Sequence, residues 1–226
     1  MKGKVLISGA SGYVGSEIAK YLHEQGYEIV SLGRNKSGSF RNIEYSLGAD
    51  IANQDLEPFD VLIHCAYDFR PLKWSEIKIQ NVNSTEKLFS QAKNCGIKKI
   101  ILISSMSSFK NTRSTYGKAK QAIENHAINY GGICIRPGVV WGKNLKGFMG
   151  TLNKVAALPI VPIIGHQADI YTCLDRDLGI LCYKIIETLK PESIYYAANS
   201  TPIKFSSLIK TLAKARNNEP IIIPVP

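Results

Sequence analysis

Tyr116 and Lys120 are the residues whose types and spacing most directly predict acid–base chemistry. They lie four positions apart in a helical pattern over residues 116–129, and residues i and i+4 share one face of a helix. A free tyrosine has a pKa of about 10 and a free lysine one of about 10.4. A lysine ammonium held near the phenol favours the phenolate, so we expect a lowered pKa for Tyr116. Tyr116 is therefore predicted to be a general acid or base.

Ser105 directly follows a predicted buried strand over residues 98–104. Its hydroxyl is expected to hydrogen-bond the same substrate oxygen as Tyr116. A Tyr-x-x-x-Lys spacing alone occurs by chance in many helices. Here it gains specificity because a glycine-rich turn and several buried strands precede it. With a nicotinamide cofactor, Tyr116, Lys120 and Ser105 predict hydride transfer in which the cofactor performs the difficult chemistry.

The glycine-rich turn lies at residues 5–15, Val-Leu-Ile-Ser-Gly-Ala-Ser-Gly-Tyr-Val-Gly. Its apolar start predicts a buried strand, and a helical pattern follows over residues 13–25. Glycine lets the backbone approach a ligand closely, and a helix start offers N–H groups and a positive dipole end to an anion. Such turns also occur without ligands, but this order favours a dinucleotide site, although the spacing is G-x-x-G-x-x-G. The expected cofactor-binding residues of the turn are Gly9, Ser11, Gly12, Tyr13, Val14 and Gly15.

The end of the second predicted strand, residues 28–32, bears on the choice between NAD and NADP. NAD sites place an acidic residue there, to bind the ribose hydroxyls. This strand instead ends in Gly33-Arg34. A guanidinium is suited to bidentate phosphate binding, so we prefer NADP over NAD, with Arg34 on the additional phosphate. The alternative is that Arg34 is a solvated loop residue, like its neighbours Lys36 and Arg41.

Two further candidate positions lie after or at the end of a predicted strand. Asp50 is placed to reach the adenine edge, or equally to cap a helix. Ala66, at the end of a buried strand over residues 61–66, is small enough to leave room for the cofactor. His64 in that strand is interpreted as a core histidine with satisfied hydrogen bonds. The aromatic loop over residues 67–74 is expected either to line a substrate pocket or to cover apolar surface.

The elements that must position these residues alternate along the chain. Six alternations of strand and helix predict an α/β fold with a doubly wound, Rossmann-type parallel sheet, and ligands at the carboxyl ends of its strands. We expect a dinucleotide-binding domain over residues 1–142. A small substrate lobe over residues 143–226 is expected to contribute partly to the sheet domain. Further strands are predicted at 43–46, 133–136, 171–174, 194–197 and 221–223, helices at 81–93, 177–189 and 205–215, and a proline-broken segment at 158–165.

Composition limits the classes of function. The chain has 226 residues, of which 45% are apolar and 20% charged, as in an ordinary soluble globule. No apolar stretch approaches the roughly 20 residues that span a bilayer, and the start does not resemble a signal peptide. The five cysteines, at positions 65, 95, 134, 173 and 182, predict free thiols in a cytoplasmic protein. We predict no metal site.

The net charge is +10. The lysines and arginines are scattered along the chain, so this charge favours an anionic cofactor and substrate over nucleic acid. The expected partner is therefore a small molecule, with no nucleic acid and no membrane.

Several short motifs together resemble the extended short-chain dehydrogenase/reductases, and in particular their NAD-dependent epimerase/dehydratase branch. The resemblance covers residues 3–142 well and the rest loosely. It is specific for the superfamily but not for one reaction. The motifs are Gly9-x-x-Gly12-x-x-Gly15, Asp50-Ile51, His64-x-Ala66, Asn81-Val82-x-Ser84-Thr85, Ser104-Ser105, Tyr116-x-x-x-Lys120 and Arg136-Pro137-Gly138-Val139-Val140-Trp141-Gly142.

The resemblance implies a Tyr–Lys–Ser catalytic set, a nicotinamide cofactor and a substrate lobe built from the later segments. It also implies homodimers that form through two helices of each subunit, and a nucleotide-linked sugar as substrate. The cofactor contacts that it adds are at Ile51, Asn81, Ser104, Lys120 and Pro137.

The sequence departs from the family pattern in four ways. Aligning on the strand gives Ser105 the catalytic place, whereas aligning on Phe109 gives it to Met106, next to Ser107. The acidic residue after the second strand is missing. There is no asparagine near Val139 to hold a substrate diphosphate, and the chain ends at Pro226, where the family usually continues.

These departures leave two substrate classes open, a nucleotide-linked sugar and a smaller carbonyl or lactone-type compound. The first hypothesis is an NAD(P)-dependent epimerase/dehydratase or reductase that uses Tyr116, Lys120 and Ser105. The second is a non-catalytic NADP-sensing or interaction protein on the same fold, because a fold does not fix a function. Intact Tyr116 and Lys120 argue against the second, since a sensor does not need them.

Overall fold

The computed structural model describes residues 2–35, 38, 40–188 and 192–225. The chain forms two compact units. The first comprises Met1–Pro137 and Arg176–Ala197, and the second comprises Gly138–Asp175 and Ala198–Pro226. This division falls five residues before the predicted domain boundary at 142/143, and it assigns Arg176–Ala197 to the first unit. The predicted boundary itself stays a prediction.

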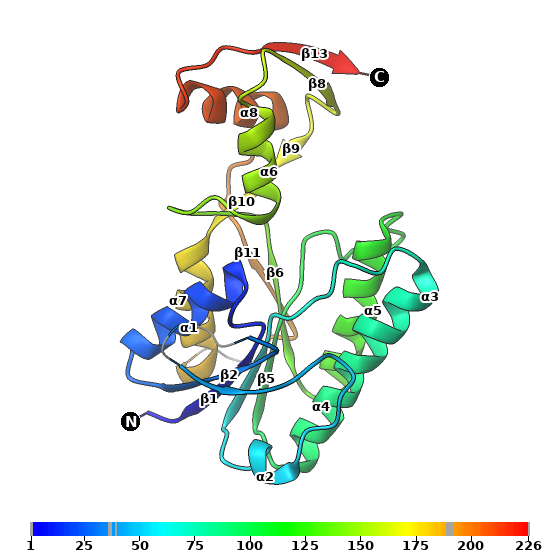
Figure 1. Ribbon diagram of the computed structural model, residues 1–226, viewed down its shortest axis with the longest axis vertical. Helices are drawn as coiled ribbons and strands as arrows, with labels where there is room; N and C mark the ends of the chain where they lie inside the picture. The colour runs from blue at the N-terminus through cyan, green and yellow to red at the C-terminus, as the bar shows by residue number, and fades with distance from the viewer. Residues whose placement is uncertain (1, 36–37, 39, 189–191, 226) are drawn as a thin grey trace. The chain divides into compact units, whose positions relative to one another are not determined.

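The first unit is built on a seven-stranded sheet in the order β11-β6-β5-β4-β1-β2-β3 (Figure 1). All six strand pairings in this sheet are parallel. The doubly wound α/β fold is therefore confirmed. Its strands are β1 (Lys4–Ser8), β2 (Glu28–Leu32), β3 (Arg41–Ile43), β4 (Val61–His64), β5 (Lys99–Ile103), β6 (Ile133–Pro137) and β11 (Ile194–Ala197).

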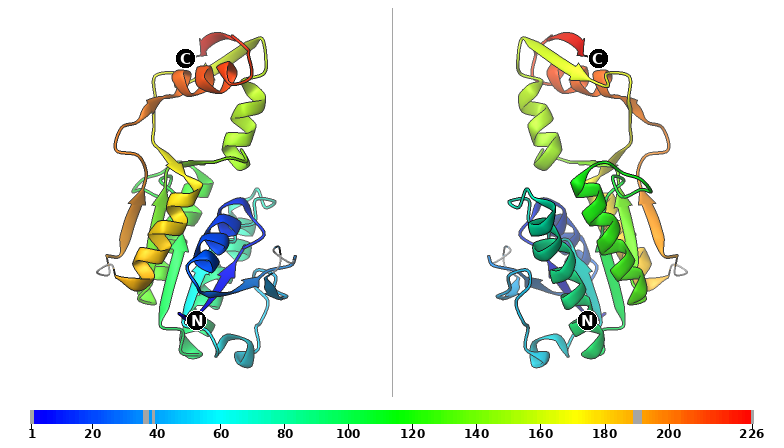
Figure 2. Two further views of the ribbon diagram at one scale, coloured as in Figure 1. Left: turned by 90° about the vertical axis from the view of Figure 1, so that its left-hand side faces the viewer. Right: turned by 90° about the vertical axis from the view of Figure 1, so that its right-hand side faces the viewer.

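Helices cover both faces of this sheet (Figures 1 and 2). α1 and α7 lie on one face and approach closely at Gly179, where a Cβ would lie 2.6 Å from Tyr21 Cβ. The opposite face carries α4 and α5. The helical elements are α1 (Tyr13–Glu24), α2 (Asn53–Leu56), α3 (Trp74–Ile77), the π-helical segment η1 (Lys78–Asn83), α4 (Ser84–Asn94), α5 (Thr115–Asn129) and α7 (Asp175–Glu187).

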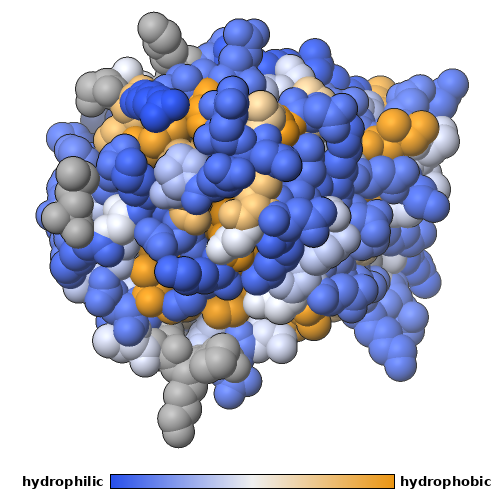
Figure 3. All heavy atoms as spheres, turned by 90° about the horizontal axis from the view of Figure 1, so that it is seen from below, coloured by the Kyte–Doolittle hydropathy of each residue, from blue (hydrophilic) through white to orange (hydrophobic). Residues whose placement is uncertain are grey.

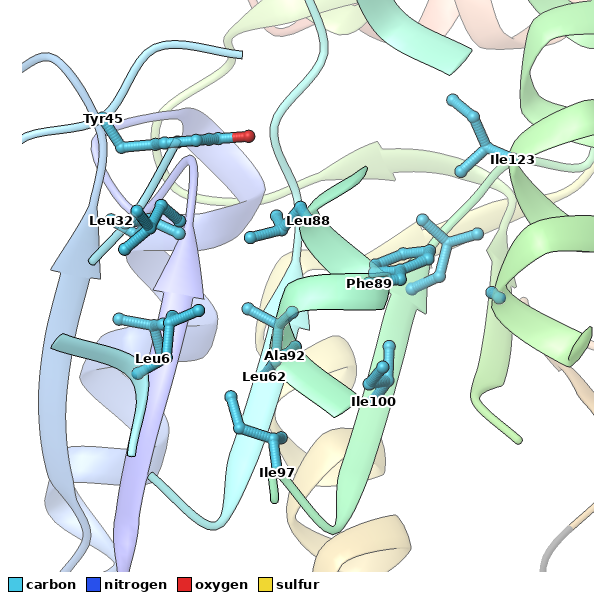
Figure 4. Packing of buried hydrophobic residues seen from close by; sticks show 14 of the residues in the cluster. Leu6, Leu32, Tyr45, Leu62, Leu88, Phe89, Ala92, Ile97, Ile100 and Ile123 are labelled. Carbon is cyan, nitrogen blue, oxygen red and sulfur yellow. The ribbon is translucent and has the colours of Figure 1, made fainter. Parts of the chain in front are cut away.

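The main core lies between the sheet and α4 (Figure 4). Leu62 and Ile100 of the sheet and Leu88 and Phe89 of α4 are fully buried. Burying a side chain of this size contributes about 1.5–3 kcal/mol, so this contact is a large part of what fixes the strand ends. The face of the molecule seen in Figure 3 is mainly hydrophilic, with small separated hydrophobic patches.

The second unit has its own small core, built from Met149, Leu152, Val161 and Ile163 together with apolar residues of α8. β7 pairs with β10 in parallel, β8 with β13 in parallel, and β9 with β12 antiparallel. The elements are β7 (Val139–Trp141), α6 (Gly147–Val155), β8 (Ile160–Ile164), β9 (Asp169–Ile170), β10 (Thr172–Leu174), β12 (Ile203–Lys204), α8 (Phe205–Lys214) and β13 (Ile221–Val225).

Three predicted segments differ from the structure. The strand expected at 43–46 is β3 at Arg41–Ile43, because it pairs with only three residues of β2. Helical structure starts at Trp74 rather than at residue 81, since Ile77 is buried although no side chain caps α3. The segment at 158–165 contains a strand, β8, despite Pro162, because Val161 and Ile163 alternate into the second core.

The remaining predicted elements match within a few residues. The helix expected at 177–189 is α7, and Leu189 itself lies outside the described residues. Within the described part of the chain, no helix combines the length and the apolar composition that crossing a membrane requires.

Candidate functional site

The carboxyl end of β1 lies at the topological switch point of the sheet. β1 pairs with β2 on one side and with β4 on the other, so the chain order reverses there. In open parallel sheets, ligands bind in the crevice at such a point. The residues that follow β1, β2, β4 and β5 therefore define the candidate site.

The glycine turn after β1 requires glycine for two separate reasons. Gly9 has φ +73°, and a Cβ there would lie 2.8 Å from the backbone N of Ala66. A Cβ at Gly15 would collide with the carbonyl oxygen of Gly9. Gly12 N donates to Gly9 O at 2.9 Å and closes the turn. The turn is thus pressed against both α1 and the end of β4.

This turn fits a dinucleotide pyrophosphate. Gly12 is the N-cap of α1, and no side chain makes a capping hydrogen bond there. Tyr13 and Val14 lie in the first turn of α1. Gly12, at the N-cap, has no side chain that could block a ligand from the backbone. A helix N-terminus without a side-chain cap, behind a close glycine turn, suits an anion. Ser11 lies within the same turn and is exposed.

Arg34 follows β2 after Gly33 and is exposed. Lys36, its predicted neighbour, lies outside the described residues. Asp50 is also exposed and pairs with Lys87 at 2.8 Å. The N-cap of α2 is Ala52, so Asp50 does not cap this helix. Ile51 beside it is 6% exposed and belongs to the core.

A tight turn rich in serine, residues 104–108, follows β5 and is called the serine turn below. The backbone N of Ser104 donates to Ile135 O at 2.7 Å, and that of Met106 donates to Pro137 O at 3.2 Å. The turn is therefore fixed on the end of β6. The hydroxyl of Ser104 is buried, and among the described residues it has no hydrogen-bond partner. A buried hydroxyl in this state offers a contact to a bound ligand, which fits the predicted cofactor contact at Ser104.

The first turn of α5 lies directly against the serine turn. A Cβ at Gly117 would lie 2.6 Å from Thr112 Oγ1 and would collide with Ser107 O, so only glycine fits. Ser114 caps the helix by accepting from Gly117 N at 3.3 Å. This close approach brings the side chains of Tyr116 and Ser105 close enough to interact. Of the two serine registers, the structure therefore brings Ser105 to the tyrosine.

The pKa of Tyr116 differs from the prediction. Burial raises it to about 12, the neighbouring Tyr67 adds to the rise, and the interaction with the Ser105 side chain opposes it. Lys120 does not produce the expected lowering, because its Nζ donates to Ile103 O at 2.9 Å. The same Nζ lies 5.9 Å from the Tyr116 ring centroid. Tyr116 is therefore protonated at neutral pH.

Lys120 is almost fully buried, at 3% exposure. Burial lowers its pKa to about 8, since the charged form loses its hydration. Its Nζ also lies 5.3 Å from the centroid of the Tyr67 ring. The lysine thus sits between the end of β5 and two aromatic rings.

His64 is a core residue, as predicted. Its Nδ1 lies 2.7 Å from Ser8 Oγ and its Nε2 lies 3.0 Å from Thr85 Oγ1. Burial lowers its pKa to about 3, so the ring is neutral. The three side chains tie the ends of β1 and β4 to α4, and His64 has no nitrogen left for a ligand.

Asn81 lies in η1 and is 1% exposed. Its amide nitrogen donates to Asp68 O at 3.0 Å, and its amide oxygen accepts from Asp68 N at 2.7 Å. The structure therefore uses this side chain to hold the loop after β4. On that loop, Tyr67 and Phe69 contact the ring of Tyr116. Sequence reasoning left this loop open between two roles and did not predict that contact.

A buried ion pair between Arg136 and Glu124 is linked to the serine turn through Ser108. Arg136 Nη2 lies 2.6 Å from Glu124 Oε2, and Arg136 Nε donates to Glu124 Oε1 at 2.9 Å. Ser108 Oγ also donates to Glu124 Oε2 at 2.7 Å. Glu124 is 2% exposed. This network links α5, β6 and the serine turn, and the sequence analysis did not single out its members as a group.

A sequence profile described as the NAD dependent epimerase/dehydratase family matches residues 5–160. The chain is also 32% identical over 139 residues to a UDP-glucose 4-epimerase from Streptomyces lividans. That alignment covers 54% of this chain and 39% of the relative, so the chain spans about two fifths of the relative's length.

Two solved structures have the same fold. The Bordetella bronchiseptica enzyme WbmH in complex with NAD+ aligns with a TM-score of 0.83 and 19% identity, over 99% of this chain and 86% of that one. UDP-glucuronic acid 4-epimerase from Bacillus cereus, in complex with NAD, aligns with a TM-score of 0.84 and 18% identity, over 98% and 87%. At these identities the likeness concerns the fold.

Proposed function

Because the chain belongs to the NAD dependent epimerase/dehydratase family, we propose that it interconverts or dehydrates a nucleotide-linked sugar by hydride transfer. One observation carries this proposal. The side chains of Tyr116, Ser105 and Lys120 lie close together near the carboxyl end of β5. When bound, the dinucleotide supplies the hydride acceptor and donor. The similarity to a UDP-glucose 4-epimerase supports a nucleotide sugar as the substrate class.

The chain's own residues supply proton transfer and orientation. Tyr116 would take the proton of the substrate hydroxyl when the sugar is oxidised and return it to the carbonyl oxygen when the sugar is reduced, so the phenol ends each cycle as it began. Its raised pKa means that it holds a proton at neutral pH before substrate binds, which is the form needed for the reduction. Ser105 lies beside the phenol and offers a second contact to that substrate oxygen. Lys120 keeps a positive charge beside the phenol at neutral pH and stabilises negative charge that develops there.

The dinucleotide is held, in this proposal, by the residues named in the sequence analysis. The glycine turn takes the pyrophosphate, Ser104 offers its buried hydroxyl, and Arg34 takes the additional phosphate of NADP. The absence of an acidic residue at the end of β2 supports NADP. WbmH and the Bacillus cereus UDP-glucuronic acid 4-epimerase have this fold and are both in complex with NAD, so the fold also accepts NAD.

Replacing Arg34 with alanine is expected to weaken NADPH binding about tenfold or more while NADH binding changes little. A hydrogen bond to a charged group contributes about 1.5–3 kcal/mol, and only NADPH carries the phosphate that Arg34 would contact. Isothermal titration with both cofactors measures this. Lys20→Ala, an exposed lysine on α1, is the control. Equal weakening of both cofactors would refute the NADP preference.

The proposed reaction is tested with UDP-glucose as the probe, followed by NMR of the sugar and by absorbance at 340 nm. Epimerisation or dehydration changes the sugar without net consumption of cofactor. The protein would instead be a reductase if it changed none of a panel of UDP- and dTDP-linked sugars but consumed NADPH stoichiometrically with simple carbonyl compounds.

A homodimer is a further part of the proposal. Exposed apolar side chains on η1 and α5 support it, because Ile79 is 65% exposed and Ile128 is 37% exposed. Sedimentation velocity at micromolar concentration is expected to give twice the chain mass. Ile79→Glu is expected to shift the protein toward the monomer, and a wild-type chain that sediments as a monomer would contradict this part.

A further inference from the structure

Three aromatic rings meet at the proposed acid–base residue. The Tyr67 and Tyr116 centroids lie 5.0 Å apart with the rings at 78°, an edge-to-face contact. The Phe69 ring stacks on Tyr116 at 5.7 Å and 24°. Tyr67 and Phe69 also contact each other, at 4.8 Å. Such pairs are worth about 0.5–1.5 kcal/mol each beyond the area they bury, so the cluster restrains the Tyr116 ring.

The loop that carries two of these rings is held by a buried group. Asn81 binds both backbone polar atoms of Asp68, at 2.7 and 3.0 Å. The Asp68 carboxylate accepts from Arg70 Nε at 2.9 Å and from Arg70 Nη2 at 2.6 Å. Asp68 lies between Tyr67 and Phe69 in the chain. Hydrogen bonds that hold its backbone therefore also restrain the backbone positions from which the two rings extend.

Phe69 is exposed, so burial in the core does not explain why its ring lies against Tyr116. Its side chain is 72% exposed, although it stacks on Tyr116. Leu72 on the same loop is 84% exposed and is a matched apolar residue for comparison. Tyr67 lies deeper and reaches both Tyr116 and the ammonium of Lys120, at 5.0 and 5.3 Å. The two loop residues therefore contact the proposed catalytic pair from outside the helix that carries it.

We propose that Tyr67 and Phe69 are positioning residues, which hold the Tyr116 ring in place so that its hydroxyl stays beside Ser105. This inference rests on the proposed role of Tyr116 in catalysis. The restraint matters because proton transfer requires the donor and acceptor within hydrogen-bond distance, and a misplacement of about 1 Å can cost a hundredfold in rate. The loop after β4 is then part of the catalytic machinery, although it donates no proton.

The first test is kinetic and uses the full chain with UDP-glucose. Phe69→Ala is expected to lower kcat about 10- to 100-fold, while KM and the dissociation constant of NADPH change less than twofold. Phe69→Tyr keeps a stacking ring and is expected to restore most of kcat. Leu72→Ala is expected to match the wild type. Unchanged kcat in Phe69→Ala, or equal loss in Phe69→Ala and Phe69→Tyr, would overturn the inference.

The second test does not need turnover. Aromatic ¹³C–¹H NMR detects the Tyr116 ring, whose signals are assigned by their loss in Tyr116→Phe. The stacked Phe69 ring should shift these signals by its ring current. Phe69→Ala is expected to move them and Phe69→Tyr to keep them near their wild-type positions. If Phe69→Ala leaves them in place, the positioning inference fails. Moved signals in a chain with no turnover would instead count against the proposed function.

Discussion

Tyr116→Phe is expected to lower kcat by about 10²–10⁴-fold, the range found for loss of a general acid or base. The substitution removes only the phenolic hydroxyl, which lies beside Ser105. The ring remains, so its contacts with Tyr67 and Phe69 are kept and the fold should be unaffected. The dissociation constant of the dinucleotide is expected to stay within about threefold, since the glycine turn is untouched.

The measurement is steady-state turnover of the active nucleotide sugar, together with thermal unfolding of each variant. Tyr183→Phe is the control, because Tyr183 lies on α7 and its hydroxyl accepts a hydrogen bond from Lys2 rather than from a residue of the candidate site. That control should keep wild-type kcat. Full activity in Tyr116→Phe would remove Tyr116 from the mechanism.

Arg136→Met is expected to lower the free energy of unfolding by about 3–5 kcal/mol, because it leaves Glu124 buried without its charged partner. Both guanidinium bonds to this carboxylate, at 2.9 and 2.6 Å, would be lost. Ser108 would remain as its partner. The serine turn depends on this network, so the variant should also lose activity at temperatures where it stays folded.

Urea unfolding followed by circular dichroism measures the change in stability. Lys4→Met is the control, since the Lys4–Glu28 pair has 44% and 32% side-chain exposure and should contribute no more than about 1 kcal/mol. The double variant Arg136→Met/Glu124→Gln is expected to recover part of the loss, because no unpaired charge stays buried. A loss below about 1 kcal/mol in Arg136→Met, the range of an exposed pair, would contradict this account of the buried ion pair.

The sheet could be predicted from the sequence because its strands are short apolar runs separated by helical patterns. The glycine turn was predictable for the same reason, since its residues are neighbours in the chain. His64 was also assigned correctly, because a lone histidine inside an apolar strand is usually a core residue. These inferences need only local sequence.

The pKa of Tyr116 could not be predicted from the spacing of Tyr116 and Lys120. The i, i+4 relation places both residues on one helix face. It does not say how deeply the helix is buried or which oxygen accepts a hydrogen bond from the lysine ammonium. The structure shows that burial dominates and that Ile103 O accepts a hydrogen bond from Lys120 Nζ. The sign of the shift was therefore wrong in the sequence analysis.

Contacts between distant residues were missed for a related reason. Asn81 and Asp68 are thirteen positions apart, and Glu124 and Arg136 are twelve apart. No periodic pattern connects such pairs. The only available signal was an aromatic loop directly after a strand end that faces the site, and it did not identify which ring the loop contacts.

The most direct test of the central claim is native mass spectrometry of the purified full chain, followed by titration with NADPH and NADH. The account predicts one dinucleotide per chain, either retained through purification or bound on titration, and loss of that binding in Gly15→Ala, where a Cβ would collide with Gly9 O. A well-folded wild-type chain that binds neither NADPH nor NADH would contradict the account.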